Sequence, residues 1–529
     1  MELLITTPQG MKNKNLLIFS VFLLIAAVIR IYLYYSIEFI KLVNIIPDDA
    51  SYYFKIAENL AMGKWLTFDS LHMTNGVHPL WLVFITPAFW LEHLGYDREF
   101  IVRLIFIMQT VLHITTGLVF YRIIRSITNE NSALFISVLF ILIIIVRFTN
   151  GLETTLFFFC LVLFIKFLLK TEGSKGWLPV GLFAGICTLS RLDFVFLIPA
   201  LYSVVTMDYF FKKSLFPFKS LVNFTVGYFI ILFPYLLYNK LEFGFIIPVS
   251  GYMKSGLNLS LPDAAANFTF LNKAYIVVYP LAIIYLIFYL SRRNQTHMIY
   301  SIKMKYRFII SVLCITVLLH SIHTAFFMKW GIFGWHFALY PVTALLVMAE
   351  FIHFILDKIP RIKMPLIYTV TALALLFILI RSNSYKKFPG GWNEESYHAA
   401  MWAKKSTTAE TVFAMKDAGH FAFFSDRKVI NLDGLVNSFS YQDVLKEKRL
   451  NEYLLRNNVQ YIVQHAFPGR NDIVINGYGE FSFPYFSHMY NTWSDPLLLS
   501  KKNEVYRSGI YNHGGENMVF LIWRFDYTR

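Results

Sequence analysis

Long apolar runs alternate with short polar loops over most of this chain. A helix needs about 20 mostly apolar residues to cross the hydrocarbon core of a bilayer. The first run of that length covers residues 16–35, and the absence of a small-residue cleavage site after it favours an uncleaved anchor. The pattern predicts an α-helical polytopic membrane protein with about eleven transmembrane helices in residues 1–381. The ten later runs fall at roughly 100–120, 132–147, 154–169, 177–190, 194–210, 220–238, 273–290, 308–327, 335–355 and 364–381.

One further apolar run, at residues 79–91, decides the topology. It is short for a span, and Pro87 interrupts it. If this run lies along the membrane surface, the basic loops all face the cytoplasm, as the positive-inside bias requires. We therefore expect juxtamembrane helices within a first extracytoplasmic loop at residues 37–99, and a cytoplasmic N-terminus preceded by Lys12 and Lys14. The basic loops lie near residues 122–125, 166–175, 212–219, 292–307 and 358–363.

The pattern changes after residue 381, where the chain becomes polar and its periodicity becomes mixed. Helical patterns at about 394–405 and 441–457 alternate with short runs of β-forming residues. We predict a small extracytoplasmic α/β domain at residues 382–529, next to the transmembrane domain. The expected strands are Thr411–Met415, Val429–Leu432, Tyr461–Gln464, Val505–Tyr511 and Met518–Phe525.

Composition agrees with a membrane protein and excludes several other classes. Of the 529 residues, 56% are hydrophobic and only 15% are charged, and the mean hydropathy is +0.51. The net charge of +15 comes largely from the basic loops, so topology explains it and we expect no nucleic-acid partner. Cys160, Cys187 and Cys314 all lie in apolar segments, so we expect neither a disulfide framework nor a zinc site.

An acidic pair stands at the start of the first extracytoplasmic loop. Asp48 and Asp49 begin a helical pattern in which Tyr53 follows on the same stretch. Acidic residues at a helix start commonly serve only as a cap or as partners of the helix dipole. Because other polar clusters are expected on the same face of the membrane, we interpret Asp48 and Asp49 as candidate catalytic carboxylates.

Two other acidic or basic clusters are expected on that face. Glu153 begins a span, where it either starts the helix or acts with the aspartates as a third catalytic residue. Glu153 and Asp48 could also hold Mg²⁺ or Mn²⁺, the only cofactor that we expect. Arg191 and Asp193 lie between two spans, either as a simple ion pair or as binding groups, with Arg191 on a donor phosphate.

Several further residues are candidates for substrate binding. His78 lies in a turn before the short apolar run, where a surface histidine is the simpler interpretation. Tyr252, Lys254 and His336 could line a groove for a lipid phosphate, although aromatic belts at membrane interfaces explain such tyrosines nearly as well. With Tyr53, Arg191 and Asp193, these residues form the predicted substrate-binding set.

A carboxylate at the membrane surface suits one type of reaction in particular. A lipid-linked sugar keeps its isoprenoid tail in the bilayer and its phosphate at headgroup level. Displacement at the anomeric carbon needs a base for the acceptor hydroxyl and positive charge near the leaving phosphate. The sequence therefore predicts glycosyl transfer from a lipid-phosphate sugar, with a first-loop aspartate as the general base.

These motifs resemble those of the GT-C superfamily of polyprenyl-phosphate-sugar-dependent glycosyltransferases. The superfamily includes protein O-mannosyltransferases, aminoarabinose transferases and terminal arabinofuranosyltransferases. The resemblance implies a GT-C fold, a polyprenyl-monophosphate hexose or pentose donor, a catalytic first-loop aspartate, and a bacterial inner membrane location. The acceptor would be an extracytoplasmic glycan, lipid or protein of the cell envelope. The stretches that carry it are Asp48-Asp49-Ala50 with Tyr53, Asn75-Gly76, His78–Trp81, Asn150–Thr154, Arg191–Asp193, Ala418–His420 and Val429–Asn437.

Two rival functions remain open. A transporter or lipid flippase could use Asp48, Asp49 and Arg191 as gating charges. Such charges usually lie near the bilayer midplane, often in repeated halves, and this chain shows neither feature. A polymerase or ligase with lipid-diphosphate donors is the second rival, and exchange of donor types in a transfer assay separates it.

Overall fold

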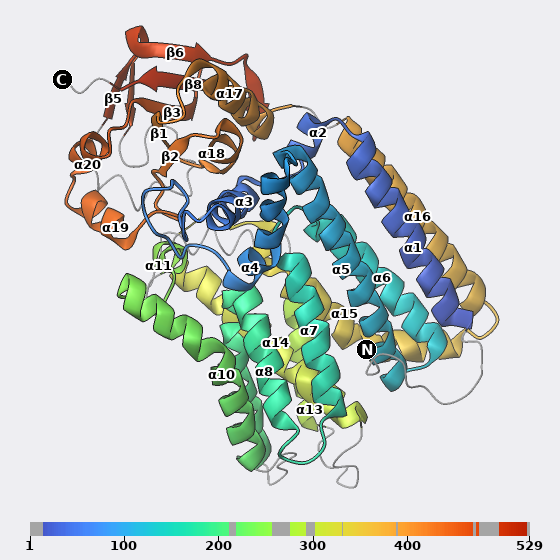
Figure 1. Cartoon of the computed structure of the whole chain (residues 1–529). Helices are drawn as coiled ribbons and strands as arrows, with labels where there is room; N and C mark the ends of the chain where they lie inside the picture. The colour runs from blue at the N-terminus through green and yellow to red at the C-terminus, as the bar shows by residue number, and fades with distance from the viewer. Residues whose placement is uncertain are drawn as a thin grey trace.

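The computed structural model describes residues 14–210, 218–255, 276–291, 302–328, 330, 332–387, 390–468, 472–475 and 497–525. The chain forms a helix bundle with a smaller α/β domain at one end of it (Figure 1). We call this the domain end of the bundle and the opposite one the far end. The first loop, with helices α3 and α4, lies between the bundle and the α/β domain (Figure 1).

Eight helical segments in the described part are long and apolar enough to cross a membrane. Three further predicted spans are shorter helices, α7 (Thr154–Lys170), α8 (Trp177–Ser190) and α13 (Val278–Ser291). Each predicted span is therefore helical, except that residues 273–275 lie outside the described part, and the count of eleven crossings stays a prediction. The eight segments are α1 (Lys14–Ser36), α5 (Arg98–Ile127), α6 (Glu130–Phe148), η3 (Leu192–Phe196) with α9 (Leu197–Phe210), α10 (Phe218–Phe243), α14 (Ile302–Phe327), η5 (Gly334–Phe337) with α15 (Leu339–Lys358), and α16 (Lys363–Lys386).

The first loop contains short helices, as predicted. They are α2 (Phe39–Val43), α3 (Asp48–Ala61), α4 (Pro79–Phe89) and the 3₁₀ turn η2 (Trp90–Leu94). At 1.5 Å per residue, α4 is about 16 Å long, roughly half the thickness of a bilayer core. This length agrees with a helix that does not span, and its place along the membrane surface stays a prediction.

The α/β domain is built on a mixed sheet with strand order β2-β1-β3-β8-β6, and β7 pairs with β8. The parallel strands are β1 (Val412–Met415), β2 (Lys428–Asn431) and β3 (Tyr461–Ala466), and the antiparallel ones are β6 (Glu504–Arg507), β7 (Tyr511–His513) and β8 (Glu516–Arg524). The helices are α17 (Trp392–Ser406), α18 (Gly419–Ser425), α19 (Phe439–Lys446) and α20 (Leu450–Arg456), and a separate ribbon pairs β4 (Asp472–Ile475) with β5 (Leu497–Ser500).

Two predicted elements of this domain are divided in the structure. The helical pattern at 441–457 forms α19 and α20, with Lys448 between them at φ +56°, a left-handed conformation that ends a helix. The run Val505–Tyr511 belongs to β6 and the start of β7. Helix α16 also continues to Lys386, a little beyond the predicted domain boundary at residue 381.

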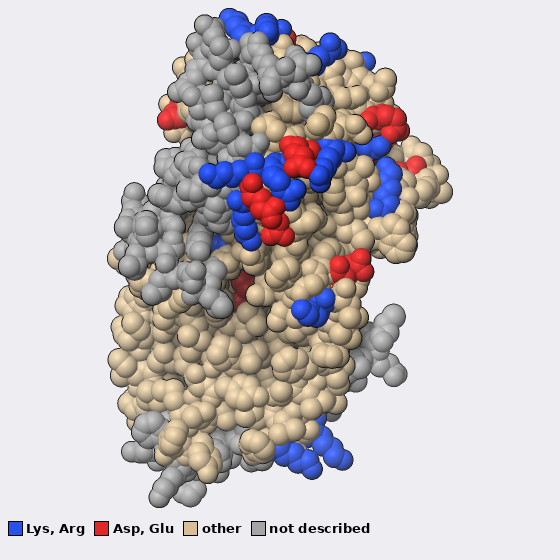
Figure 2. All heavy atoms as spheres, turned by 90° about the vertical axis from the view of Figure 1, so that its left-hand side faces the viewer, with Lys and Arg blue, Asp and Glu red and all other residues tan. Residues whose placement is uncertain are grey.

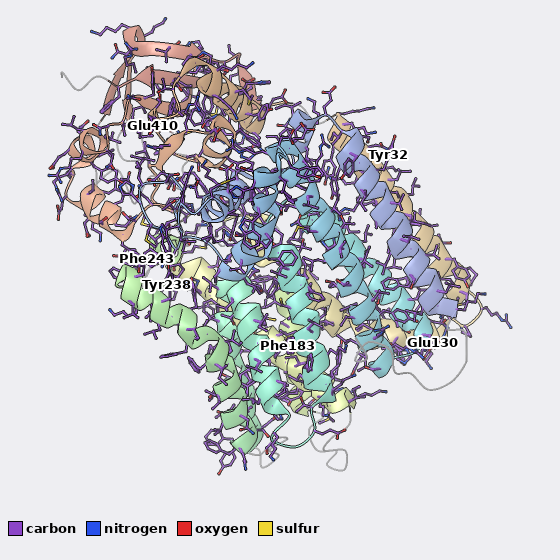
Figure 3. The ribbon with its side chains drawn as sticks, in the orientation of Figure 1. Tyr32, Glu130, Phe183, Tyr238, Phe243 and Glu410 are labelled. Carbon is purple, nitrogen blue, oxygen red and sulfur yellow. The ribbon has the colours of Figure 1, made fainter. Side chains whose placement is uncertain are left out.

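Charged side chains are distributed as a membrane protein requires. In the view of Figure 2, Lys, Arg, Asp and Glu gather over the α/β domain and at the far end, and the belt between them is almost free of charge. Glu130 lies at the far end and Glu410 lies in the α/β domain (Figure 3). Glu130 pairs with Arg125 of a predicted cytoplasmic loop, Oε1 to Nη2 3.1 Å. Residues 211–217 and 292–301 of two other such loops lie outside the described part.

Candidate functional site

A pocket at the domain end brings together most of the predicted site residues. It has an empty volume of about 550 Å³, part of it open to solvent. Its walls come from the first loop, the starts of α7 and η3, helix α11 (Val249–Lys254), η5 and the α/β domain. Figure 2 shows a hollow with acidic atoms at its base where the charged region meets the uncharged belt. The predicted residues among its lining are Asp49, Tyr53, His78, Glu153, Arg191, Lys254 and His336.

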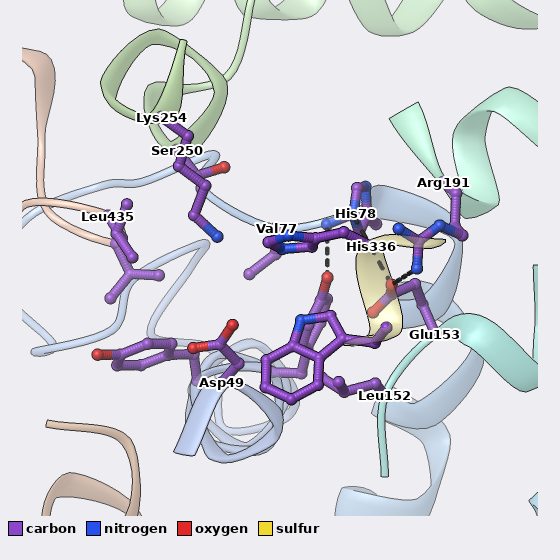
Figure 4. Close-up of a pocket in the computed structure, with 15 residues that line it drawn as sticks. Asp49, Val77, His78, Leu152, Glu153, Arg191, Ser250, Lys254, His336 and Leu435 are labelled. Atoms are coloured by element: carbon purple, nitrogen blue, oxygen red, sulfur yellow. Dashed lines mark hydrogen bonds and ion pairs between the residues drawn. The ribbon is translucent and has the colours of Figure 1, made fainter. Parts of the chain in front are cut away.

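Asp49 places its carboxylate in this pocket (Figure 4). It occupies the first turn of α3, and in the described part of the chain it forms neither an ion pair nor a hydrogen bond. Burial raises the pKa of the Asp49 carboxyl from its ordinary value of 3.8 to about 6, and Lys254 opposes that shift. The carboxylate is thus poised to accept a proton near neutral pH.

Asp48, the neighbouring residue, faces the α/β domain. Its Oδ2 accepts from the backbone N–H of Gly419 at 2.8 Å, and its Oδ1 accepts from that of His420 at 2.7 Å. The Nδ1 atom of His420 lies 2.9 Å from Asp48 Oδ1. Asp48 therefore accepts hydrogen bonds from the free backbone N–H groups at the start of α18, a helix distant in sequence. It is not part of the pocket lining.

Two glycines allow the first loop and the α/β domain to approach each other closely. A Cβ atom at Gly419 would lie 2.2 Å from the backbone oxygen of Asp48. At Gly76 of the first loop, a Cβ atom would lie 1.9 Å from the backbone oxygen of Leu435. The α/β domain thus packs backbone to backbone against the first loop at two points, and Leu435 and Val436 reach the pocket.

Glu153, Arg191 and Asp193 form a connected ion-pair cluster on the bundle side. Arg191 Nη1 donates to Glu153 Oε1 at 2.7 Å (Figure 4), and Arg191 Nη2 donates to Asp193 Oδ2 at 2.7 Å. The guanidinium is 3% exposed, so two carboxylates share one buried cation. The simple Arg191–Asp193 pair considered above is therefore part of a triad that includes Glu153. Asp193 lies beside a neighbouring cavity with His320 and Tyr340, not in the first pocket.

His78 is held in the pocket wall and is not a surface residue. Its backbone N–H donates to Tyr53 Oη at 3.2 Å, and its Nδ1 accepts from the Leu192 N–H at 3.1 Å. An accepting Nδ1 leaves the proton on Nε2, which lies 3.9 Å from Glu153 Oε1. Burial lowers the pKa of His78, so the neutral form dominates at pH 7.

Lys254 enters the pocket from α11, across from Asp49, and His336 enters from η5 (Figure 4). No described carboxylate forms an ion pair with Lys254. Helix α11 is fixed by Asn75 of the first loop, whose Oδ1 accepts from the Val249 N–H at 2.9 Å and whose Nδ2 donates to Asn239 at 3.2 Å. The first loop thus positions both Asp49 and the element that carries Lys254.

Tyr252 does not line this pocket, and its predicted role in a groove for a lipid phosphate stays a prediction. Its ring packs against Phe439 of α19 with centroids 5.8 Å apart, and its hydroxyl accepts from Lys446 at 3.3 Å. On α11, Tyr252 and Lys254 project in different directions because residues two apart on a helix do not share a face. Tyr252 therefore joins α11 to the α/β domain.

Sequence reasoning missed the polar network behind the pocket. Asp433 Oδ2 accepts from Tyr52 Oη at 3.1 Å, from Asn431 Nδ2 at 2.9 Å and from the Asp417 N–H at 3.0 Å. Its Oδ1 accepts from the Leu435 N–H at 2.9 Å, so Asp433 shapes the turn that presents Leu435. Strand β2 ends at Asn431, and Asp433 lies in the bend that follows it. Ser250, another lining residue, gives no sequence signal.

Both residues of the predicted metal site are engaged by other groups of the protein. Within the ranges that the structure covers, no group of three or more His, Cys, Asp or Glu is arranged to hold a metal. Glu153 lines the pocket, but its Oε1 is engaged by Arg191, and both oxygens of Asp48 accept hydrogen bonds from α18. The assignment of Mg²⁺ or Mn²⁺ to Asp48 and Glu153 stays a prediction.

Comparison with known proteins bears on the fold. Residues 385–506 match the sequence family described as a domain of unknown function, DUF8728. No curated protein matches the sequence. The fold is similar to that of ArnT from Cupriavidus metallidurans bound to undecaprenyl phosphate, with a TM-score of 0.50 and 9% identity over 95% of this chain and 97% of that one. The archaeal oligosaccharyltransferase AglB from Archaeoglobus fulgidus, in complex with an inhibitory peptide and a dolichol-phosphate, gives a TM-score of 0.49 and 12% identity over 84% of this chain and 69% of that one.

The chain has a GT-C fold. The likeness to ArnT extends over nearly the whole of both chains, so it includes the helix bundle and the α/β domain. The predicted fold class, a GT-C bundle with a small C-terminal domain, is confirmed. At identities this low the likeness concerns the fold alone, and function has to be argued from this chain's own site residues.

Proposed function

We propose that this protein transfers a sugar from a polyprenyl-monophosphate donor to an acceptor outside the cytoplasm, with Asp49 as the general base. The observation that carries the proposal is that one pocket contains both a carboxylate, which can accept a proton, and a cation, which can stabilise a leaving phosphate. Asp49 faces Lys254 across the pocket, and neither is neutralised by a described partner. A base and a cation on opposite walls suit a displacement with an anionic leaving group.

The reaction balances with these two groups. The acceptor hydroxyl oxygen attacks the anomeric carbon and passes its proton to Asp49. The bond between that carbon and the phosphate oxygen breaks, and the electron pair leaves with polyprenyl phosphate. Lys254 stabilises the growing negative charge on that oxygen. The neighbours support this donor class, since one is bound to undecaprenyl phosphate and another to a dolichol-phosphate.

Arg191 takes a different role from the one that its position in the sequence suggests. Its guanidinium is already bound by Glu153 and Asp193, which together carry more negative charge than it can balance. A phosphate would gain little from this cluster and would meet two carboxylates there. We therefore assign phosphate binding to Lys254, and assign to Arg191 the positioning of Glu153 beside His78.

The proposal is tested with purified protein in proteoliposomes that contain a panel of radiolabelled polyprenyl-phosphate hexoses and pentoses. Envelope fractions from cells that lack the gene supply the acceptor. We expect labelled product together with free polyprenyl phosphate, and neither from the Asp49→Asn variant. Lipid movement across the bilayer without a glycosidic product would favour the transporter alternative, and activity only with diphosphate donors would favour the ligase alternative.

The same assay examines the acceptor and the metal. Fractionation of the labelled product into glycan, lipid and protein identifies the acceptor class. Dialysis against EDTA followed by addition of Mg²⁺ or Mn²⁺ measures any metal requirement. If Asp48 and Glu153 hold a metal, restoration by the cation is lost in the Glu153→Gln variant.

A further inference from the structure

A second pocket lies at the domain end between α1, α6 and α16, and it shares no lining residue with the first. Its empty volume, part of it open to solvent, is about 350 Å³. The charged lining residues are two arginines, Arg30 of α1 and Arg381 of α16, and no carboxylate lines it. Tyr34, Tyr385, Thr149 and Ser382 supply hydroxyl groups. The lining chemistry is therefore that of an anion site.

Arg30 is a buried cation without a charged partner. It is 3% exposed, within a helix that is otherwise apolar. Its Nε donates to Tyr34 Oη at 2.9 Å, and its Nη1 lies 3.0 Å from His113 Nδ1. No carboxylate among the residues with assigned positions pairs with it. An arginine keeps its charge in proteins, and a buried charge without a counter-ion is costly.

Arg381 provides the second cation at the same pocket. It is exposed, and its guanidinium carbon lies 4.9 Å from the centroid of the Tyr385 ring. This stacking fixes the side chain without neutralising it. The pocket thus combines one buried and one exposed guanidinium, and guanidinium groups bind phosphate oxygens in bidentate geometry.

The second pocket lies near the domain end of α1 and α16. Arg30 lies six residues before the end of α1, and Arg381 lies five residues before the end of α16. At 1.5 Å per residue, both lie about 8–9 Å from the domain end of their helices. Tyr32 and Tyr35 on the same turns are exposed, and Lys386 lies 5.6 Å from the Tyr32 ring (Figure 3). Exposed tyrosine and lysine at a helix end are typical of the membrane interface.

We infer that this second pocket binds the phosphate group of a membrane lipid through Arg30 and Arg381. The apolar chains of the lipid would lie along the exposed apolar faces of α1 and α16, where Val28, Phe377 and Ile380 are 58%, 49% and 58% exposed. The ligand chemistry is a lipid-borne phosphate, carried by either a phospholipid or a polyprenyl chain. Because the two pockets have no residue in common, the inference does not depend on the proposed function.

The test uses the full chain, purified in detergent and freed of lipid. Binding is measured by native mass spectrometry with dioleoylphosphatidylglycerol, undecaprenyl phosphate, dioleoylglycerol and inorganic phosphate as separate probes. Undecaprenyl phosphate is measured in the Lys254→Gln background, which weakens its binding at the first pocket. We expect at least one phosphate-bearing lipid to be retained at least about tenfold more strongly than dioleoylglycerol.

Two variants and a matched control locate the binding. Arg381→Gln changes an exposed side chain and should fold normally, and Arg30→Gln removes the buried cation. Each should weaken retention of the phosphate-bearing lipid about tenfold or more. Arg361→Gln, an exposed arginine at the far end of the bundle, should not change it.

Each outcome bears on the inference. Selection of undecaprenyl phosphate alone identifies a second carrier-lipid site, and equal retention of phosphatidylglycerol identifies a headgroup site; both support it. Equal retention of dioleoylglycerol, or binding of inorganic phosphate without any lipid preference, would overturn it. Unchanged lipid retention by a folded Arg381→Gln variant would also overturn it.

Discussion

Two groups of charged residues at the first pocket differ in how their charges are satisfied. On the bundle wall, Arg191 is held between Glu153 and Asp193. Asp49 and Lys254 instead face each other across the pocket and have no described ion-pair partner. A charged group already paired within the protein interacts only weakly with a substrate, whereas an unpaired one can interact strongly with it. We therefore assign positioning to the Arg191 cluster and chemistry to Asp49 and Lys254.

The largest expected effect separates the two adjacent aspartates. Asp49→Asn removes the proposed base and should lower kcat in the transfer assay by about 10²–10⁴-fold, with normal expression and folding. Asp48→Asn, the matched control, should retain most of the turnover because its carboxylate binds α18. Similar losses of kcat in both variants would contradict the assignment of the base to Asp49.

The next test removes the cation of the bundle wall. Arg191→Gln leaves Glu153 and Asp193 buried without a counter-ion, which costs about 3–5 kcal/mol in the free energy of unfolding. Thermal unfolding in detergent, followed by the fluorescence of a thiol-reactive dye or by light scattering, measures this loss. A second substitution, Asp193→Asn, should restore part of the stability. If Arg191→Gln instead kept normal stability and raised the KM for the donor, Arg191 would be a substrate-binding residue.

Lys254 is expected to show the opposite behaviour. Lys254→Gln should change stability little, because no described carboxylate depends on it. It should lower kcat/KM for the lipid donor by roughly 10–100-fold, the value of one charge-assisted hydrogen bond. Initial rates at varied donor concentration measure this, and Lys446→Gln on the nearby surface is the control. Equal kinetics for wild type and Lys254→Gln would remove the cation from the mechanism.

A smaller effect should appear in stability at Asp48. Asp48→Asn weakens the bonds to the Gly419 and His420 N–H groups and the interaction with the start of α18, a loss of about 1–2 kcal/mol. Limited proteolysis of the α/β domain and the Tm of the full chain report it. A variant as resistant as wild type would show that the contact contributes little to docking.

The smallest effect is a pH dependence with a definite sign. The pKa of Asp49 is about 6 in the folded protein, above its ordinary value of 3.8, so ionisation of Asp49 destabilises the fold. The penalty is absent below pH 4, grows between pH 4 and 6, and is complete above pH 6. Asp49→Asn should therefore raise the Tm at pH 8 and leave it nearly unchanged at pH 4. In wild type, the rate should rise with pH to a plateau above about pH 6; a flat profile between pH 5 and 7 would contradict the base.

The sequence predicted the fold closely for a simple reason. Each span is a continuous apolar run, so its position needs no knowledge of its neighbours. The sided distribution of lysine and arginine then placed residues 49, 153, 191 and 254 on one face, and all four line the same pocket in the structure. Local pattern and topology were sufficient for that much.

What the sequence could not predict depends on contacts between distant residues. Asp48 and Asp49 differ by about 100° in direction around α3, and the partner that engages Asp48 lies 371 positions later. The role of Arg191 likewise depends on Glu153, 38 positions earlier. The packing of Tyr252 against Phe439 of the α/β domain was equally out of reach of the local sequence.

The backbone contact at Gly76 has a consequence for any attempt to divide the protein. No side chain separates the backbone of Gly76 from that of Leu435, so the two surfaces fit closely against each other. A version of the helix bundle made without its α/β domain would lose part of the pocket wall and leave Asp49 open to water. The pKa of its carboxyl would then fall towards the ordinary value, because the burial that raises it would be lost.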